Sequence, residues 1–283
     1  MDVIHRVNEL RKRLKREASI AFVATMGNLH AGHISLVDLA HRHGQCVVAS
    51  IFVNRLQFEP GGDFDRYPRT LAPDLAMLDA AGCHVAFVPD ESEMYPAPQE
   101  IVLTPPRVAD QLCGDFRPGH FQGVTTVVTK LFNIVAPHTA IFGKKDYQQL
   151  HVIQSLVKQL NFGIAIVGAE TVREADGLAL SSRNSYLSAK ERQQAAQLHQ
   201  GLKRIQDEVE AGSRHYSRLE ERAAADLAAA GWRVDYVALR NRSELAPPGP
   251  HERELVALAA AWLGTTRLID NLEIGSLSKD RLL

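Results

Sequence analysis

The sequence predicts an α/β protein with a doubly wound, mostly parallel sheet, followed by a second, smaller α+β C-terminal domain. Two observations lead to this fold class. Short apolar runs alternate with segments of helical periodicity through the first part of the chain, and this alternation stops near residue 175. The composition of 283 residues, 45% hydrophobic and 23% charged, supplies enough apolar material for a core in each domain.

The first part of the chain alternates between the two kinds of segment. Short apolar runs predict strands at 19–24, 45–53, 83–88, 139–142 and 163–167. Helical periodicity predicts helices through Ile34, Leu36, Val37 and Leu39, and over 70–81, 125–135 and 148–160. Strands that alternate with helices of this size indicate βαβ units, and therefore a Rossmann-like sheet with helices on both faces.

Ligands of such sheets bind where the strands end at their carboxyl side. The expected site therefore lies in the loops after Ala24, Val53, Phe142 and Val167.

The pattern changes after residue 175. A long polar helix is expected over 188–212, with Ser188 as its N-cap and Glu191 three residues further on. A second helix is expected over 223–230, and strands over 233–239, 254–262 and 266–269. We place the boundary within 170–176 and divide the chain into residues 1–172 and 173–283.

Charge and cysteine content exclude several classes of protein. There are 32 Lys and Arg against 33 Asp and Glu, a net charge of −1, which argues against nucleic acid as the main partner. Cys46, Cys83 and Cys113 form no CxxC pair, so neither a disulfide framework nor a zinc ribbon is expected. The basic segment 1–17 lacks the apolar core of a signal peptide, and no apolar run approaches the ~20 residues of a membrane span. We expect a cytoplasmic protein.

The segment 25–33, Thr-Met-Gly-Asn-Leu-His-Ala-Gly-His, follows the first of these strands and opens a helix. Gly27 and Gly32 allow the backbone to approach an anion, and a helix N-terminus offers unpaired N–H groups. His30 and His33 are three residues apart and so face the same side of the first turn. Ordinary surface or capping histidines, or half of a metal site, are the alternatives. The strand–turn–helix position favours phosphate binding, and the missing Glu of HExxH disfavours a zinc protease.

Amide side chains end the next strand, at Asn54 and Gln57. An amide both donates and accepts, which suits a small ligand with hydroxyls and a carboxylate, although the two residues taken alone are better explained as the end of a loop.

Two further segments carry basic groups. Gly143, Lys144, Lys145 and Asp146 follow a strand and open a helix, so Gly143 and Lys145 fit phosphate or ribose contacts. Asp146 is expected to cap the helix, contact a nucleotide or hold a cation, and capping is the commonest of these roles. The sequence Leu180-Ser181-Ser182-Arg183 is a surface loop on its own. Beside an HxGH motif it becomes a candidate for neutralising a triphosphate, because the Arg fork binds phosphate oxygens in pairs.

The HxGH motif in this context resembles that of the HIGH-type nucleotidyltransferase superfamily. The chain as a whole is similar to the pantoate–β-alanine ligase family over nearly its full length. The matching stretches, in that family's order, are ATMGNLHAGHISLV, SIFVNRLQF, DRYPRT, RPGHFQGV, FGKKDYQQL, DGLALSSRNSYLS and AAWLGTTRLIDN.

Two positions depart from the family pattern. Ala24 stands where the family usually has Pro, which is expected to loosen a turn. Arg55 replaces another usual Pro and is expected to place a charge near the pantoate site.

The resemblance implies attack of a pantoate carboxylate on the α-phosphorus of ATP, then capture of the adenylate by β-alanine. It assigns proton donation to His33, α-phosphate stabilisation to His30, and neutralisation of phosphate charge to Lys145 and Arg183. Gln57, Gln149 and Asn54 are expected to bind pantoate, and Gln57 also β-alanine. The ATP site is expected to comprise Met26, Gly27, Asn28, Leu29, His30, Ala31, Gly32, His33, Gly143, Lys144, Lys145, Asp146, Val172, Leu180, Ser181, Ser182 and Arg183.

ATP is then a substrate, Mg²⁺ is expected on its triphosphate rather than in a protein cage, and no protein metal ligand is assigned. The resemblance also suggests a homodimer, and the smaller domain is expected to close over the labile adenylate. The alternatives are another HIGH-type nucleotidyltransferase that forms a nucleotide-linked metabolite, and a binding protein without catalytic activity.

Overall fold

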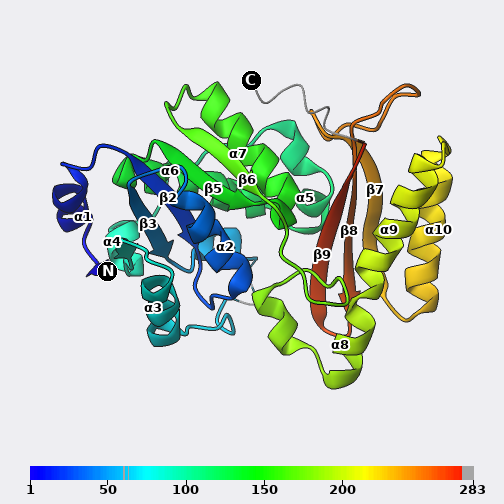
Figure 1. Ribbon diagram of the computed structural model, residues 1–283, viewed down its shortest axis with the longest axis horizontal. Coiled ribbons are helices and arrows are strands. Elements are labelled where there is room, and N and C mark those ends of the chain that lie inside the picture. Colours follow the sequence, from blue (N-terminus) through cyan, green and yellow to red (C-terminus); the bar gives the residue numbers. More distant parts are fainter. Residues whose placement is uncertain (60, 63, 276–283) are drawn as a thin grey trace. The chain divides into compact units, whose positions relative to one another are not determined.

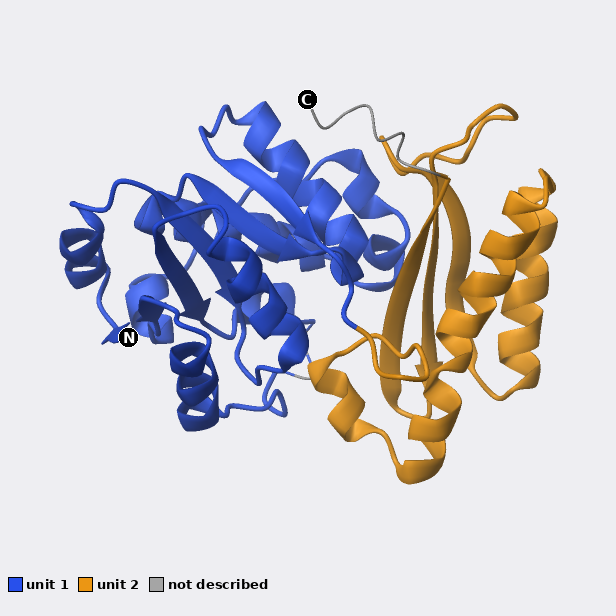
Figure 2. Ribbon diagram, in the orientation of Figure 1, with its two compact units in different colours: residues 1–172 blue, residues 173–283 orange. Residues whose placement is uncertain are grey.

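The computed structural model describes residues 1–59, 61–62 and 64–275. The chain divides into two compact units, Met1–Val172 and Arg173–Leu283 (Figure 2). Each unit has its own hydrophobic core residues.

The described part of the first unit is built on a six-stranded parallel sheet (Figure 1). In sheet order the strands are β1 (Asp2–Ile4), β4 (Val85–Phe87), β3 (Cys46–Ile51), β2 (Ile20–Thr25), β5 (Thr139–Gly143) and β6 (Ala165–Ala169). The chain runs from β2 outward to β3 and β4, and then returns to the other side of β2 for β5 and β6. The order therefore reverses between β2 and β5, and crevices at such switch points bind ligands in open α/β sheets.

Alternating side chains of the central strand enter two different cores. Ile20 and Phe22 of β2 pack in one core, and Ala21 and Val23 pack in the other. This is the side-chain period of two that a strand buried on both faces requires. The first face is covered by α1 (Val7–Leu14), α6 (His120–Val135) and α7 (Tyr147–Gln159), the second by α2 (Ala31–Ala40) and α3 (Leu71–Ala80). Short helices at Glu91–Met94 (α4) and Cys113–Phe116 (α5) complete the unit.

The predicted parallel sheet and its flanking helices are confirmed, with three corrections. Residues 1–17, for which no element was predicted, form β1 and α1. The helix expected from residue 125 begins at His120. It includes Gly123, where the absence of a side chain lets α6 pack closely against the backbone of Leu56. A Cβ at Gly123 would lie 2.2 Å from the Leu56 carbonyl oxygen. Ala24 pairs with Ser50 inside the ladder of β2 and β3, so it loosens no turn.

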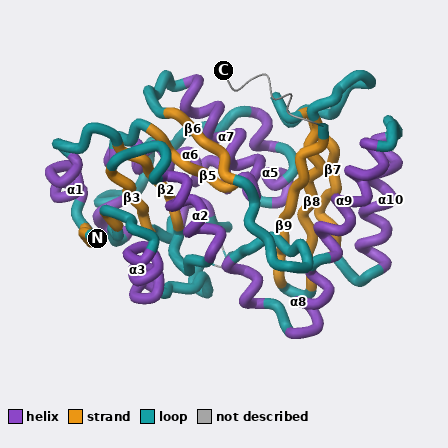
Figure 3. Tube along the Cα trace, viewed as in Figure 1, coloured by secondary structure: helices purple, strands orange, loops and turns teal. Residues whose placement is uncertain are grey.

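The second unit contains a three-stranded antiparallel sheet in the order β7 (Arg233–Asn241), β8 (Leu255–Leu263), β9 (Thr266–Ile274) (Figure 3). Helices α9 (Gln197–Glu210) and α10 (Tyr216–Ala229) share a core with this sheet. α10 and β9 are longer than the sequence predicted.

The single helix predicted over 188–212 is wrong. Its residues form α8 (Ala189–Ala195) and α9, which are separated at Ala196. No Gly or Pro marks this break, and both Ala195 and Ala196 are buried, so packing rather than a breaking residue sets it. The predicted start is confirmed: Ser188 caps α8 and exchanges hydrogen bonds with Glu191 in a capping box.

A search of the described residues finds no helix that is long and apolar enough to cross a membrane.

Candidate active site

The turn after β2 has a backbone that only small or special residues accept. Gly27 has φ of +81° and Asn28 has φ of +51°. A Cβ at Gly27 would also lie 3.0 Å from Oδ2 of Asp74 and 3.2 Å from the Ile51 side chain. Glycine at position 27 is therefore required twice, by its left-handed backbone and by the close approach of its neighbours.

A buried carboxylate holds this turn. Asp74 of α3 is 2% exposed and accepts hydrogen bonds from the backbone N–H groups of Asn28 at 2.9 Å and Leu29 at 2.8 Å. The Thr70 hydroxyl donates to the same carboxylate at 3.1 Å. Nothing in the sequence pattern distinguishes Asp74, because an acidic residue in the first turn of a helix is ordinarily explained by the helix dipole.

His30 and His33 form a reciprocal cap at the start of α2. The Gly32 N–H donates to Nδ1 of His30 at 3.1 Å, and the His30 N–H donates to Nδ1 of His33 at 3.3 Å. Because Nδ1 accepts in both rings, the proton of each neutral imidazole lies on Nε2. The ring centroids are 4.1 Å apart, so the cap brings two N–H donors side by side at a helix N-terminus.

Both imidazoles are strongly biased towards their neutral form. Burial and the nearby Lys145 ammonium lower the pKa of His30 to about 4. Burial, His30 and Lys145 lower the pKa of His33 to about 3. At neutral pH the two rings therefore act as neutral hydrogen-bond donors. An anion placed against the two N–H groups would favour the charged form and raise both pKa values.

Lys145 and Asp146 follow β5, on the other side of the switch point. Their charges act on both histidines, the ammonium lowering and the carboxylate raising the imidazole pKa values. Lys145 Nζ lies 3.8 Å from Asp146 Oδ2. The adjacent Lys144 forms an ion pair with Glu170 at 2.5 Å, and Gly143, just before it, ends β5. The structure thus brings Lys145, Asp146 and the two histidines together, as the sequence predicted.

Gln57 lies at the end of a hydrogen-bonded chain. The Tyr95 hydroxyl donates to Asn54 Oδ1 at 2.7 Å, and Asn54 Nδ2 donates to Gln57 Oε1 at 3.1 Å and to the Gly123 carbonyl at 3.2 Å. Gln57 Nε2 then donates to the sulfur of Met26 at 3.1 Å. Asn54 is 1% exposed, and its amide N–H groups are both engaged inside the protein. In this arrangement the Asn54 side chain orients Gln57.

The backbone of Gln57 is held from α6. His120 Nδ1 donates to the Gln57 carbonyl at 2.8 Å, and Arg117 approaches the same oxygen at 3.4 Å. Arg117 also donates to Nε2 of His120 at 3.1 Å, which fixes the proton of that ring on Nδ1. The sequence alone indicated no role for Arg117, His120 or Tyr95. The burial of Tyr95 raises the pKa of its hydroxyl and keeps it a donor.

Arg55 does not direct its charge towards Gln57. Its guanidinium forms an ion pair with Glu91 at 2.9 Å and stacks over the ring of Phe64, 3.9 Å from the centroid. The side chain is 56% exposed. The expected charge at the pantoate site is therefore engaged elsewhere.

The other predicted residues lie in three places. Gln149 is half-buried near the start of α7, and Val172 is the last residue of the first unit. Leu180, Ser181, Ser182 and Arg183 belong to the second unit, where the Ser181 hydroxyl accepts a hydrogen bond from the Arg183 N–H at 3.3 Å.

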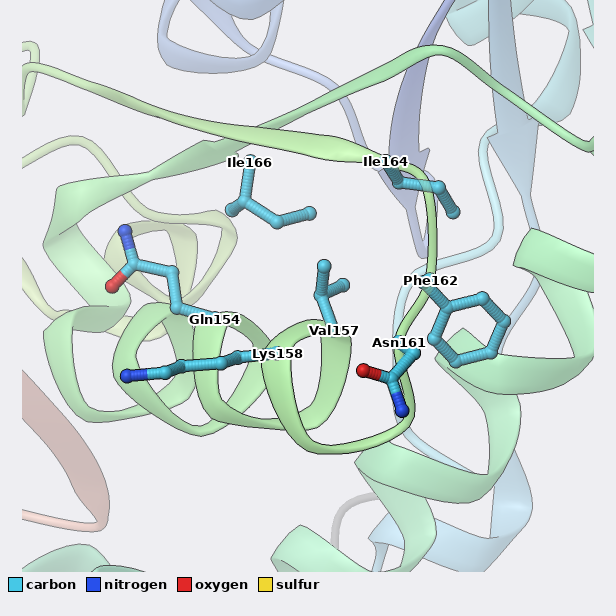
Figure 4. Close-up of a pocket in the computed structure, with 7 residues that line it drawn as sticks. All are labelled: Gln154, Val157, Lys158, Asn161, Phe162, Ile164 and Ile166. Carbon is cyan, nitrogen blue, oxygen red and sulfur yellow. The ribbon is translucent and has the colours of Figure 1, made fainter.

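A shallow hollow lies at another part of the first unit. It is lined by residues from the end of α7 to β6, including Lys158, Phe162 and Ile166 (Figure 4). None of the predicted site residues lines it. Within the described residues, no group of three His, Cys, Asp or Glu side chains is arranged to hold a metal ion.

Most of the predicted groups of the first unit thus follow the ends of β2, β3 and β5, around the switch point of a doubly wound sheet. Donor groups and a lysine beside a helix N-terminus are typical of α/β enzymes that bind phosphate-containing substrates.

Comparison with known proteins gives the family. A model of the pantoate–β-alanine ligase family matches residues 2–273. The chain is 56% identical over 274 residues to the pantothenate synthetase of Nitrosospira multiformis, which covers 97% of this chain and 98% of that protein. The chain therefore belongs to the pantoate–β-alanine ligase family.

Solved structures agree. A pantothenate synthetase from Thermus thermophilus has a TM-score of 0.93 at 42% identity, covering 98% of this chain and 100% of that one. A pantoate–β-alanine ligase from Francisella tularensis, complexed with β-γ ATP and β-alanine, has a TM-score of 0.80 at 30% identity, with 96% and 97% covered. These likenesses confirm the fold class that the sequence predicted.

Proposed function

We propose that this chain catalyses the ATP-dependent ligation of (R)-pantoate and β-alanine to pantothenate, through pantoyl adenylate, with release of AMP and pyrophosphate. Membership of the family supports the reaction. The observation that carries the mechanism is the pair of neutral imidazoles at the start of α2, with Lys145 beside them.

In the first step a pantoate carboxylate oxygen forms a bond to the α-phosphorus, and the bond from that phosphorus to the pyrophosphate oxygen breaks. Negative charge grows on the phosphoryl and leaving oxygens. Nε2–H donors of His30 and His33 stabilise the α-phosphate, and the Lys145 ammonium offsets the charge that develops. Donors that are already fixed by the cap need no reorganisation when the reaction occurs, which is the main source of such stabilisation.

In the second step the β-alanine amine attacks the acyl carbon, the acyl–oxygen bond to AMP breaks, and the amine nitrogen loses a proton. Gln57 is proposed to contact both substrates. Tyr95 and Asn54 orient its side chain and His120 holds its backbone, which supports this role. Gln149, at the start of α7, is proposed to bind the pantoate hydroxyls.

The second unit contributes Leu180, Ser181, Ser182 and Arg183 to the phosphates and acts as a lid, with Val172 lining the adenine pocket. The adenylate is labile to water, so closure protects it. Crystals of the free and nucleotide-bound protein test this directly. An unchanged interdomain angle and unchanged order in 180–183 would exclude the lid.

ATP enters as its Mg²⁺ complex, with the ion bound by triphosphate oxygens, as Mg²⁺ usually is. We further propose a homodimer in the cytoplasm. Sedimentation equilibrium measures the oligomeric state, and a mass equal to that of one chain would exclude the homodimer.

The reaction is tested by release of AMP and pyrophosphate from ATP·Mg²⁺ and pantoate, with and without β-alanine. Steady release of AMP that requires both substrates is expected. Pyrophosphate release without any dependence on the amine would instead indicate another HIGH-type nucleotidyltransferase, and no release would indicate a binding protein.

A further inference from the structure

The second unit contains a buried ion cluster that the proposed reaction does not use. Asp270 of β9 is 4% exposed and receives both prongs of the Arg173 guanidinium, at 2.7 and 2.9 Å. His199 of α9 approaches the same carboxylate with Nδ1, at 3.2 Å. Burial would raise the pKa of Asp270, but the hydrogen bonds from His199 and Arg173 outweigh it and hold that pKa below its ordinary value.

Arg173 connects this carboxylate to a short hairpin. The same guanidinium donates to the Gly177 carbonyl at 3.0 Å and to the Asn271 carbonyl at 3.0 Å. The backbone of Arg173 also pairs with Ala179 across the hairpin. One side chain therefore fixes the start and the turn of segment 173–179 against β9.

His199 supports the turn of the hairpin from the other side. Gly177 has φ of +94°, and a Cβ there would lie 2.5 Å from Cδ2 of His199. The turn thus rests directly on the imidazole that contacts Asp270. An ion pair between Asp176 and Arg192 at 2.6 Å adds a link to α8.

The segment 180–183 continues directly from this hairpin. The Asn184 amide donates to the Ala179 carbonyl at 3.0 Å, and Ser181 caps the turn of 3₁₀ helix (Ser182–Tyr186) that carries Arg183. The position of Arg183 within the second unit therefore depends on where the hairpin is held.

A buried ion pair is weak evidence for a purely stabilising role, because removing two charges from water often costs as much as their attraction returns. Apolar side chains would fill the same space without this cost. The ion pair instead fixes geometry: the planar Arg173 guanidinium holds Asp270 and the carbonyl groups of Gly177 and Asn271 in fixed positions relative to one another.

We propose that Asp270, acting through Arg173 and His199, is a positioning residue that holds the 173–179 hairpin so that Ser181–Arg183 meet the phosphates during adenylate formation. This inference rests on the proposed function. It assigns the cluster to the first half-reaction only, because pyrophosphate has left before the amine attacks.

The test uses the full chain with Asp270→Asn, which keeps the shape of the side chain and removes its charge. Pantoate-dependent exchange of pyrophosphate with ATP reports the first half-reaction. Formation of pantothenate from supplied pantoyl adenylate and β-alanine reports the second. We expect exchange to fall about 10–100-fold, since ångström-scale misplacement of a catalytic group costs this much, while the second half-reaction stays within about twofold.

Asp235→Asn is the matched control. Asp235 lies in the same sheet, its side chain is 5% exposed, and it forms an ion pair with Arg267 at 2.7 Å. An equal loss of exchange in this control, or an equal loss in both half-reactions of Asp270→Asn, would show a general structural effect and overturn the proposal. So would exchange in Asp270→Asn at the wild-type rate.

Gly177→Ala provides a second test that keeps all three side chains of the ion cluster and pushes the turn and His199 apart. The same selective loss of exchange is expected, and unaltered exchange would overturn the proposal. Wild-type protein that shows no pantoate-dependent exchange would contradict the proposed function itself, so the two failures are distinguishable.

Discussion

Two loops in different units are each held by a buried aspartate that lies far away in the sequence. Asp74 bonds the turn at Gly27–Leu29 directly, from 46 residues beyond Asn28. Asp270 holds the 173–179 hairpin through Arg173, from 97 residues away. The first arrangement fixes a backbone that presents neutral donors, and the second fixes a backbone that leads to a permanent cation.

The difference fits the groups being presented. A neutral imidazole at a helix N-terminus can donate to a ligand only in one tautomer and one orientation. The turn before it is therefore held by direct hydrogen bonds from its backbone N–H groups to Asp74. Arg183 is always charged and reaches through a long side chain, so holding the hairpin before it is sufficient. In both loops a local motif supplies the proposed functional groups, and a carboxylate distant in the sequence fixes the backbone that carries them.

The largest effect is expected from removing an imidazole donor of the first loop. His33→Ala should lower kcat about 10²–10³-fold, as loss of one fixed donor to a developing oxyanion does. His33→Gln, whose amide nitrogen replaces Nε2, should recover part of this, and His33→Asn should not. Steady-state turnover measures all three, and equal turnover of the Gln and Asn variants would contradict the assigned tautomer.

Asp74→Asn tests the direct anchor of the first loop. One carboxylate oxygen becomes an NH₂ group that faces a backbone N–H, so we expect kcat/KM for ATP to fall about 10–100-fold and stability by about 1–3 kcal/mol. Asp79→Asn is the control, because Asp79 lies on the same helix with a side chain 66% exposed. If the two variants had the same kcat/KM for ATP, Asp74 would not position the turn.

Tyr95→Phe tests the chain that orients Gln57. Loss of one hydrogen bond to Asn54 should cost about 1 kcal/mol, which raises KM for pantoate about fivefold. KM for ATP should stay unchanged, because Tyr95 bonds Asn54, which orients Gln57 and not the histidines proposed to bind ATP. Initial rates with each substrate varied in turn measure both constants, and a parallel rise in the two would contradict this role.

Arg55→Ala should have a small effect. The exposed pair with Glu91 is worth about 0–1 kcal/mol, so KM for pantoate should change less than about twofold. A tenfold change in that constant would show that the guanidinium acts on the substrate after all.

The protonation of His30 and His33 should not change in the pH range where an ordinary imidazole titrates. Their lowered pKa values keep the neutral form at every pH above about 4 for His30 and about 3 for His33. The ring carbon shifts of both residues, followed by NMR in the free protein, should therefore not change between about pH 8 and about pH 5. A midpoint near the ordinary imidazole pKa for either ring would contradict the buried, lysine-coupled arrangement.

The local patterns predicted the parallel sheet and the HxGH turn, because strand period and glycine requirements act over a few residues. The grouping of Lys145 with the histidines followed from the sheet class, because ligands of such sheets bind where the strands end at their carboxyl side. They did not predict Asp74, Tyr95 or Asp270. The contribution of each depends on a contact that only the tertiary structure creates. The helix break at Ala196 is of the same kind, since no residue there disfavours a helix. Asn54 was predicted to bind pantoate, and this contact stays a prediction; the structure adds that Asn54 is buried and donates a hydrogen bond to Gln57.

The adenylate route is tested most directly with pantoate labelled with ¹⁸O in its carboxylate. Attack on the α-phosphorus makes a carboxylate oxygen the bridge to AMP, and amine attack on the acyl carbon leaves that oxygen with the phosphate. We therefore expect one ¹⁸O atom in the AMP released. Unlabelled AMP, or ¹⁸O found in inorganic phosphate together with ADP, would contradict it.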